Sequence, residues 1–239
     1  MLIRDNTARA KQIISIFWIM FGLTFINLGS LAWQYWLLQD LFSNPQDFDP
    51  ETGRTSDLLQ NIVTVANLAI YILAIVFFIM WQRRAYYNLH QLPWHNARYS
   101  EGWAAGSWFV PIINFWWPYQ IMIDIWRGTQ NALRERLGEP QPPRIVGWWW
   151  ALYLVNNFWG IVLVFGGGEN SVGEYMVSTR VQIIGEIISI PVILLAIRVV
   201  QRTNYFEREL LIHSQTPADS IFSDNYVPPV KTIEPKFEN

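Results

Sequence analysis

The sequence contains no cysteine, and charged residues make up only 15% of its 239 positions. Without cysteine the chain can form no disulfide, and it offers no thiolate nucleophile or sulfur ligand for zinc or an iron–sulfur cluster. Soluble domains carry roughly 25% charged residues, whereas this chain is 51% hydrophobic and 16% aromatic. A charge deficit of this size indicates a protein that lies in lipid.

The sequence also lacks the motifs of the common catalytic and nucleotide-binding mechanisms. It contains no HExxH, GxSxG, P-loop or GxGxxG pattern, and its three histidines show no metal-ligand spacing. The 17 basic and 19 acidic residues leave no excess of positive charge for nucleic acid. We therefore assign no catalytic residue, metal site or cofactor, and we expect no nucleic-acid partner.

Four apolar stretches are long enough to cross a bilayer as α-helices, for which about 20 residues are needed. They lie at residues 13–38, 58–81, 145–165 and 181–200, and the only basic residue in them is Arg198, near the end of the last one. The first follows a cytoplasmic N-terminus at residues 1–12, and its length favours a retained anchor over a cleaved signal peptide. The sequence thus predicts an all-α integral membrane domain with four transmembrane helices in residues 13–204.

A fifth apolar stretch, at residues 103–126, is interrupted by Pro111 and Pro118, with Asn114 between them. Proline lacks a backbone donor and obstructs the preceding turn, so a continuous helix is not expected. Broken backbone at membrane depth must be buried in protein or must line a water-filled cavity. We predict a re-entrant or interfacial segment whose freed backbone groups need partners. The nearest candidate partners are Arg84, Asn88, Gln120, Asn156 and Asn157.

The distribution of Lys and Arg predicts the topology, because these residues collect in cytoplasmic loops. If the N-terminus is cytoplasmic and the broken segment returns to its own side, only Arg54 and Arg180 of the 17 basic residues lie outside. A full crossing by residues 103–126 would instead place the arginines between residues 127 and 144 outside. We expect a multi-pass protein of the cell membrane, with both termini cytoplasmic and a disordered tail at residues 205–239.

Polar side chains inside the apolar stretches are the main functional candidates, because they are costly in lipid unless they are paired. Glu186 in the last span could relay a proton or coordinate a cation. Alternatively, an asparagine such as Asn67 or Asn156 could bond to it and link two helices. Asp124 lies three residues before Arg127, a spacing that would pair the two on a helix.

The second span is expected to continue as a cytoplasmic helix, since residues 82–92 contain no helix breaker before Pro93. Arg84 and Asn88 share one face of this extension. Arg83 and Arg84 could bind anionic lipid headgroups, or they could serve only to set the topology. A homo-oligomer or a protein partner is also expected if the protein forms a pathway, because four spans alone are too few to enclose one.

Several of these residues belong to a longer pattern. It reads Trp81-x-x-Arg84-Ala85-x-x-Asn88, Tyr99-Ser100-x-Gly102-Trp103-Ala104-x-Gly106, Trp108-Phe109-x-Pro111-x-x-Asn114 and Pro118-Tyr119-Gln120, and it continues through Gly147-Trp148-Trp149-Trp150-Ala151-Leu152 to Asn156. In these residues the chain resembles the bacterial membrane proteins known as domain of unknown function 4328. The resemblance runs from the second span to the last and implies a helical membrane fold without an assigned activity. The pair Trp116-Trp117 departs from the pattern.

Three classes of function remain open. A non-catalytic membrane component that binds protein or lipid best fits the missing catalytic motifs. The alternatives are a small permeation or transport element that uses the broken segment, and an intramembrane enzyme in which Glu186, Asp124 or Asn114 acts as acid, base or polar clamp. A cavity that reaches both Glu186 and Asn114 would favour the alternatives. The candidate functional or partner-binding residues are Arg84, Asn88, Pro111, Asn114, Pro118, Gln120, Asn156 and Glu186.

Overall fold

The computed structural model describes residues 3–93, 95–166 and 171–215, and all regular structure in these residues is helical. Four long helices form the body: α1 (Thr7–Ser43), α2 (Pro50–His90), α6 (Arg144–Gly166) and α7 (Val172–Gln215). Between α2 and α6 lie the short helices α3 (Trp103–Gly106), η1 (Ile113–Phe115), α4 (Trp117–Asn131) and α5 (Arg134–Leu137). The all-helical fold expected from the sequence is confirmed.

Three helices, Thr7–Ser43, Pro50–His90 and Val172–Ser214, are long and apolar enough to cross a membrane. Their outer faces expose large apolar side chains such as Trp18, Ile26, Leu68 and Ile187. Extended apolar surface of this kind is unfavourable in water and is satisfied by lipid. The fourth predicted span corresponds to α6, and four crossings are not confirmed.

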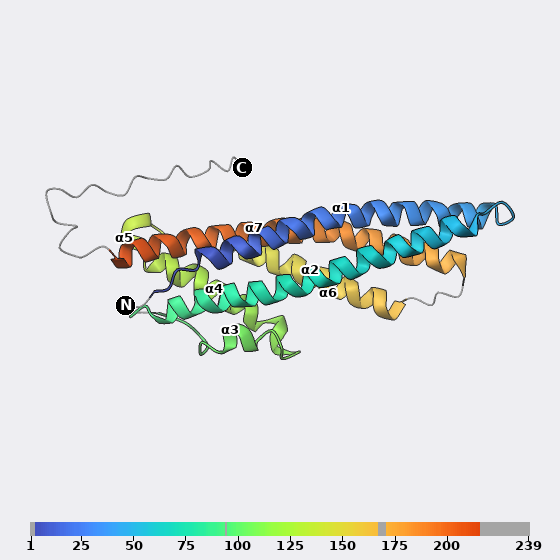
Figure 1. Cartoon of the computed structure of the whole chain (residues 1–239). Coiled ribbons are helices and arrows are strands. Elements are labelled where there is room, and N and C mark those ends of the chain that lie inside the picture. The colour runs from blue at the N-terminus through green and yellow to red at the C-terminus, as the bar shows by residue number, and fades with distance from the viewer. Residues whose placement is uncertain (1–2, 94, 167–170, 216–239) are drawn as a thin grey trace.

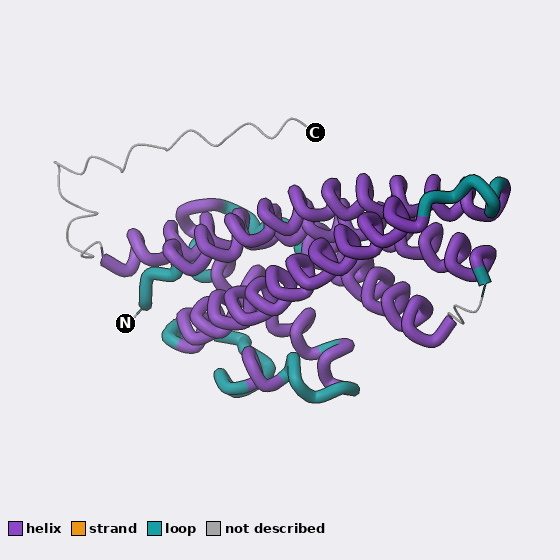
Figure 2. Tube along the Cα trace, turned by 45° about the vertical axis from the view of Figure 1, so that its right-hand side comes forward, coloured by secondary structure: helices purple, strands orange, loops and turns teal. Residues whose placement is uncertain are grey.

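The long helices pack in the order α2, α1, α7, α6. Helix α1 contacts both α2 and α7, and α6 packs on the other side of α7. Figures 1 and 2 show that the four helices run roughly along one axis, with the α1–α2 connection and the start of α7 at the same end. The beginning of α1, the end of α7 and the short helix α5 lie at the opposite end (Figure 1).

Helix α2 begins at a well-defined cap and then runs without interruption past the predicted span. The Asp49 carboxylate accepts hydrogen bonds from the backbone N–H groups of Glu51 (3.1 Å) and Thr52 (3.3 Å), while Pro50 occupies the first turn, where no N–H is needed. The helix contains 41 residues, which corresponds to about 60 Å, or twice the thickness of a hydrocarbon core. The predicted extension beyond residue 81 is therefore present.

The segment that follows α2 is broken, as its prolines indicate. Helix α3 ends at Gly106, Pro111 lies in the turns that follow, and Pro118 stands in the first turn of α4, where proline is well tolerated. Pro118 thus begins a helix of 15 residues rather than interrupting one. The tip of the segment is apolar and exposed, with Phe109 and Ile112 at 74% and 86% exposure.

At both ends of the described chain, the helices extend beyond the predicted spans. Helix α1 begins at Thr7, inside the segment read as the cytoplasmic N-terminus, and Ala10 is already buried. Helix α7 continues to Gln215, so residues 205–215 are helical and not part of a disordered tail. Phe206 and Leu210 are buried there, and the Phe206 ring packs edge-on against Trp126 at 5.3 Å. Residues 216–239 lie outside the described part of the chain.

Candidate functional site

A pocket of about 360 Å³ lies between the long helices and receives side chains from α1, α2, α6 and α7. One wall is aromatic: the Phe78 ring lies 5.6 Å from that of Trp108 and 5.5 Å from that of Trp149. Trp108 belongs to the broken segment, so this segment closes one side of the pocket. The polar side chains that face the pocket include Asn67, Tyr71, Tyr153, Asn156, Asn157 and Glu186.

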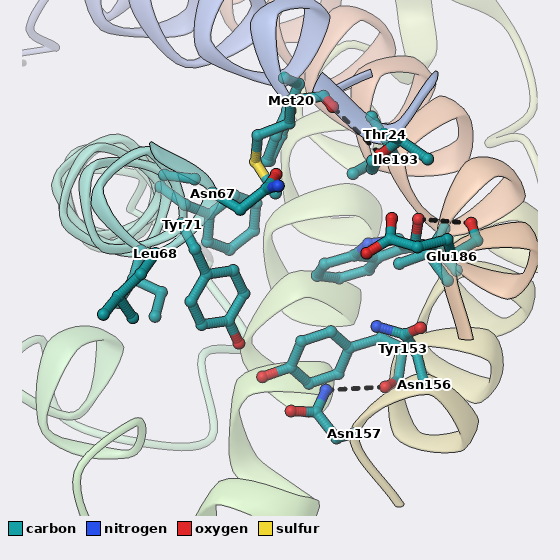
Figure 3. A pocket seen from close by; sticks show the side chains of 18 of the residues that line it. Met20, Thr24, Asn67, Leu68, Tyr71, Tyr153, Asn156, Asn157, Glu186 and Ile193 are labelled. Atoms are coloured by element: carbon teal, nitrogen blue, oxygen red, sulfur yellow. Dashed lines mark hydrogen bonds between the residues drawn. The ribbon is translucent and has the colours of Figure 1, made fainter. Parts of the chain in front are cut away.

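Helices α2 and α6 both line the pocket, and they pack mainly on α1 and α7 rather than on each other. Figure 3 shows Tyr71 of α2 and Tyr153 of α6 extending toward one another across it, with Glu186 of α7 on the far side from Tyr71. Asn157 donates a hydrogen bond to the Tyr153 carbonyl (2.8 Å), and Asn67 donates one to Val63 (3.0 Å). Both amides are therefore anchored to their own helices.

Glu186 is held in place by a hydrogen-bonded chain that joins three helices. Its carboxylate accepts from the side-chain amide of Asn27 on α1 (2.7 Å), and the Asn27 oxygen accepts from Gln60 on α2 (3.3 Å). The Gln60 oxygen in turn accepts from the Ser30 hydroxyl (2.7 Å). The structure thus pairs Glu186 with an asparagine, but with Asn27 rather than with Asn67 or Asn156.

A close approach of α6 to α7 sets the position of Glu186. A Cβ atom on Gly185 would lie 2.9 Å from Cδ1 of Trp159, so only glycine leaves room for the indole here. The same indole donates a hydrogen bond to the carbonyl of Val181 at 2.9 Å. Gly185, which directly precedes Glu186, is therefore the residue in the sequence that indicates the close contact between α6 and α7.

A second carboxylate, Glu207, forms a polar cluster that the sequence reading missed. It is 5% exposed and accepts hydrogen bonds from the side-chain amides of Asn6 (3.0 Å) and Asn88 (3.1 Å). Asn88 also bonds to both backbone groups of Arg4, each at 2.9 Å. The cluster ties the N-terminal segment to α2 and α7. Arg84 lies close enough to act electrostatically on Glu207, and Arg83 is exposed.

Glu207 lies on α7 beyond residues 181–200, the part of the helix predicted to span the membrane. Complete burial raises the pKa of its carboxyl to about 7, because the charged form loses its hydration. The hydrogen bonds from Asn6 and Asn88 oppose this rise in pKa, as does Arg84, while Asp5 adds to it. The carboxyl therefore titrates near neutral pH.

Asp124 on α4 has a different partner from the one expected. Its carboxylate accepts from the backbone N–H of Arg98 (3.0 Å) and lies 3.4 Å from the Arg98 guanidinium. Arg127 acts on it only as a nearby charge. Burial raises the pKa of Asp124, and Arg98 opposes the rise. The pair connects the loop after α2 to α4.

Many backbone groups of the broken segment bond to one another, and two side chains that were not among the expected partners bond to further carbonyls there. Gln82, which is fully buried, donates to the Pro118 carbonyl (3.2 Å) and accepts from the Trp108 indole (2.7 Å). The Trp150 indole donates to the Phe115 carbonyl at 3.3 Å. Of the expected partners, Gln120 accepts from the Tyr99 hydroxyl within the same region.

The eight candidate residues therefore do not converge on one site. Asn156 and Glu186 line the pocket, whereas Arg84 and Asn88 belong to the Glu207 cluster. Pro111, Asn114, Pro118 and Gln120 lie in the broken segment or in the helix that it leads into. The side-chain oxygen of Asn114 is buried and has no hydrogen-bond partner among the described residues. Asn114 does not line the pocket.

The helices and the pocket define the class as a helical protein with the features of a membrane protein. The comparison with family models gives the particular family: the model described as Domain of unknown function (DUF4328) matches residues 44–205, and the chain belongs to this family. The match begins after α1 and ends within α7, in agreement with the resemblance found in the sequence. No curated protein and no solved structure matches the chain.

Proposed function

We propose that the protein is a non-catalytic, multi-pass membrane component that binds a small amphipathic molecule, such as a lipid, in the pocket between α2 and α6. The observation that carries this proposal is an apolar and aromatic cavity of about 360 Å³ with Glu186 and several amides and phenols at its wall. Ligand pockets commonly have volumes of roughly 300–1,000 Å³ and combine apolar walls with a few fixed polar groups. The Asn27 bond and the anchored amides supply such fixed groups.

The proposed topology places four crossings in the cell membrane, with α6 as the fourth and both termini in the cytoplasm. It is supported by the arrangement in Figure 1, where the ends of α1 and α7 expected in the cytoplasm share one end of the molecule with α5. The chain has no cysteine, so each introduced thiol is unique. Cysteine at Asn44 or Ser171 should react with an impermeant maleimide from outside, and cysteine at Ser100 or Gln141 should not. Labelling at Gln141 without labelling at Ser171 would contradict this topology.

A lateral opening to lipid explains why the pocket favours binding of a membrane-dissolved molecule. Leu68 on α2 lines the pocket and is itself 58% exposed, so the wall is continuous with the lipid-facing surface. The cavity reaches Glu186 and stops short of Asn114. Arg83, exposed at the end of the second predicted span, adds a site where an anionic headgroup could lie.

Transport is a second candidate, favoured by one specific observation. Trp108, a residue of the interrupted segment, forms part of the pocket wall, and discontinuous segments often line the substrate sites of transporters. Movement of this segment would change access to the pocket. Uptake of a bound molecule into vesicles containing the protein would separate transport from simple binding.

A matched pair of substitutions on α2 tests the binding proposal. Leu68→Trp should fill part of the pocket, whereas Leu73→Trp adds the same bulk at a position that is 44% exposed and does not line the pocket. The protein should be purified in native lipid, and the small molecules that copurify should be identified by mass spectrometry. We expect a molecule that is retained by the parent and by Leu73→Trp and is lost from Leu68→Trp. Identical profiles in all three would contradict the proposal.

A further inference from the structure

The pocket contains a carboxylate that no cationic side chain compensates. Glu186 accepts one hydrogen bond, from the neutral amide of Asn27. Among the described residues, none of the ion pairs includes Glu186, and no Lys, Arg or His lines the pocket. An ionised carboxylate removed from water is strongly unfavourable unless a positive charge or several hydrogen bonds accompany it. Glu186 can therefore be stabilised in the pocket in two ways, by taking up a proton or by binding a positively charged ligand.

The walls around this carboxylate are of the kind that hold cations. Tyr71 and Tyr153 lie on opposite walls of the pocket, and Trp108 and Trp149 pack around Phe78 on a third. Aromatic faces attract cations through the negative potential above the ring, and tryptophan and tyrosine do so most strongly. The attraction increases where water is excluded. A carboxylate and several aromatic rings thus share one partly enclosed space.

We propose that the molecule bound in this pocket is a lipophilic cation, such as a protonated amine or a quaternary ammonium with an apolar body. The inference rests on the proposed function, because it assigns the charge of the ligand that the pocket is proposed to hold. The positive group lies against Glu186, and the apolar body lies against the aromatic and aliphatic walls. An anionic ligand would meet the carboxylate with no opposing charge in the pocket, and a neutral ligand could be accommodated only with Glu186 protonated.

Equilibrium binding to the full chain in phosphatidylcholine nanodiscs tests the inference. The probes are radiolabelled tetraphenylphosphonium, which is cationic, and triphenylphosphine oxide, a neutral molecule of related shape. Discs with Leu68→Trp provide the background. We expect the parent to bind the cation more tightly than the neutral probe. Glu186→Gln, which keeps an acceptor for Asn27, should weaken cation binding by about tenfold or more and leave the neutral probe within about twofold.

Asp57→Asn is the charge-matched control, since it removes one carboxylate from an exposed position outside the pocket. This variant should bind both probes as the parent does. If the parent and Glu186→Gln bind both probes equally, and Leu68→Trp still blocks them, the cation inference is wrong and the pocket remains a binding site. If neither probe binds the parent better than Leu68→Trp, the proposed function is wrong and the inference with it.

Discussion

Helix α7 carries two carboxyl side chains, Glu186 and Glu207, that are bonded to asparagine amides and yet lie in opposite surroundings. They are separated by 21 residues, or about 30 Å along the helix. Two amides enclose Glu207, which is 5% exposed. Glu186 has one amide partner and faces a cavity of about 360 Å³. The same residue type is sealed into the fold at one end and left available to a ligand at the other.

The difference shows how to separate a structural carboxylate from a functional one. Both groups bridge helices, so bridging alone does not distinguish them. Glu207 joins α7 to α2 and to the N-terminal segment, and both of its oxygens accept bonds. Glu186 keeps bonding capacity that no described side chain uses. We therefore expect substitutions at Glu207 to change stability and substitutions at Glu186 to change binding more than stability.

The largest effect is expected for Glu207→Leu. It would leave one N–H of each of the Asn6 and Asn88 amides buried without its acceptor, while the other N–H keeps its bond to Trp81 or Arg4. Each buried unsatisfied group costs about 1–3 kcal/mol. We predict a loss of about 2–4 kcal/mol in the free energy of unfolding, measured as a lower melting temperature by intrinsic tryptophan fluorescence in detergent. Glu209→Leu is the control, because it breaks only a partly exposed pair with Arg136 and should cost less than about 1 kcal/mol. Equal losses would contradict a structural role specific to Glu207.

The next largest effect on stability is expected from the titration of the Glu207 carboxyl. Its pKa is about 7 in the folded protein against 4.5 for the free group, so the folded state binds more protons than the unfolded state between these values. The contribution of this carboxyl to stability therefore falls as pH rises from about 4.5 through 7 and becomes level above that, by an amount on the order of 3 kcal/mol. Asp5 acts on the same carboxyl, and hydrogen bonds from Thr7 lower the pKa of Asp5, so it stays charged over this range. Melting temperatures from pH 5 to 8 should show the slope.

Glu207→Gln is the control for this pH dependence, because it keeps the shape of the side chain and removes the titration. Its melting temperature should change little between pH 5 and 8. If the parent protein instead gains stability as the pH rises through this range, the pKa of Glu207 is not raised in the folded protein.

The sequence predicted the parts of this comparison that depend on local pattern. The low content of charged residues indicated a protein that lies in lipid, and Pro111 indicated the break before α4. The absence of helix breakers after Trp81 predicted the extension of α2 that carries Asn88. Glu207 escaped notice because the residues around it are polar, and a polar stretch near a terminus is typical of a tail. Its partner Asn6 lies 201 residues away in the sequence. Nothing local indicates a contact of that range.

The partner of Glu186 was unpredictable for a different reason. The long helices are apolar on nearly every side, as the exposed Trp18 of α1 and Ile187 of α7 illustrate. Without a polar face, the sequence does not indicate the rotation of one helix against the next. The sequence reading named Asn67 and Asn156 as candidate partners, whereas packing selected Asn27. The same uncertainty concealed Gln82 as the partner of the Pro118 carbonyl and the Trp108 indole.

A smaller effect on stability is expected at Glu186. Glu186→Leu removes the acceptor of Asn27, while Asn27 still accepts from Gln60. Hydrogen bonds between helices in membranes contribute about 0.6 kcal/mol on average and rarely more than about 2, so we predict a loss of about 1 kcal/mol. Glu186→Gln should melt like the parent. If Glu186→Gln and Glu186→Leu lower the melting temperature equally, the carboxylate has a structural role that the single bond to Asn27 does not explain.

The smallest effect is expected at Asn114, which extends the comparison to a polar side chain without a partner. Its oxygen is buried and makes no hydrogen bond to the described residues, so Asn114→Leu leaves no donor unsatisfied. We predict a change in stability below about 0.5 kcal/mol. The neighbouring Phe115 ring stacks on Phe158 at 5.8 Å, and Phe158 lies about 20 Å along α6 from Arg144. Residue 114 should therefore lie well below the headgroups even though it tolerates substitution.

A bimane label on Asn114→Cys should be quenched more by spin labels deep in the acyl chain than by labels at the headgroup. Stronger quenching at the headgroup would show that the broken segment lies flat on the membrane surface.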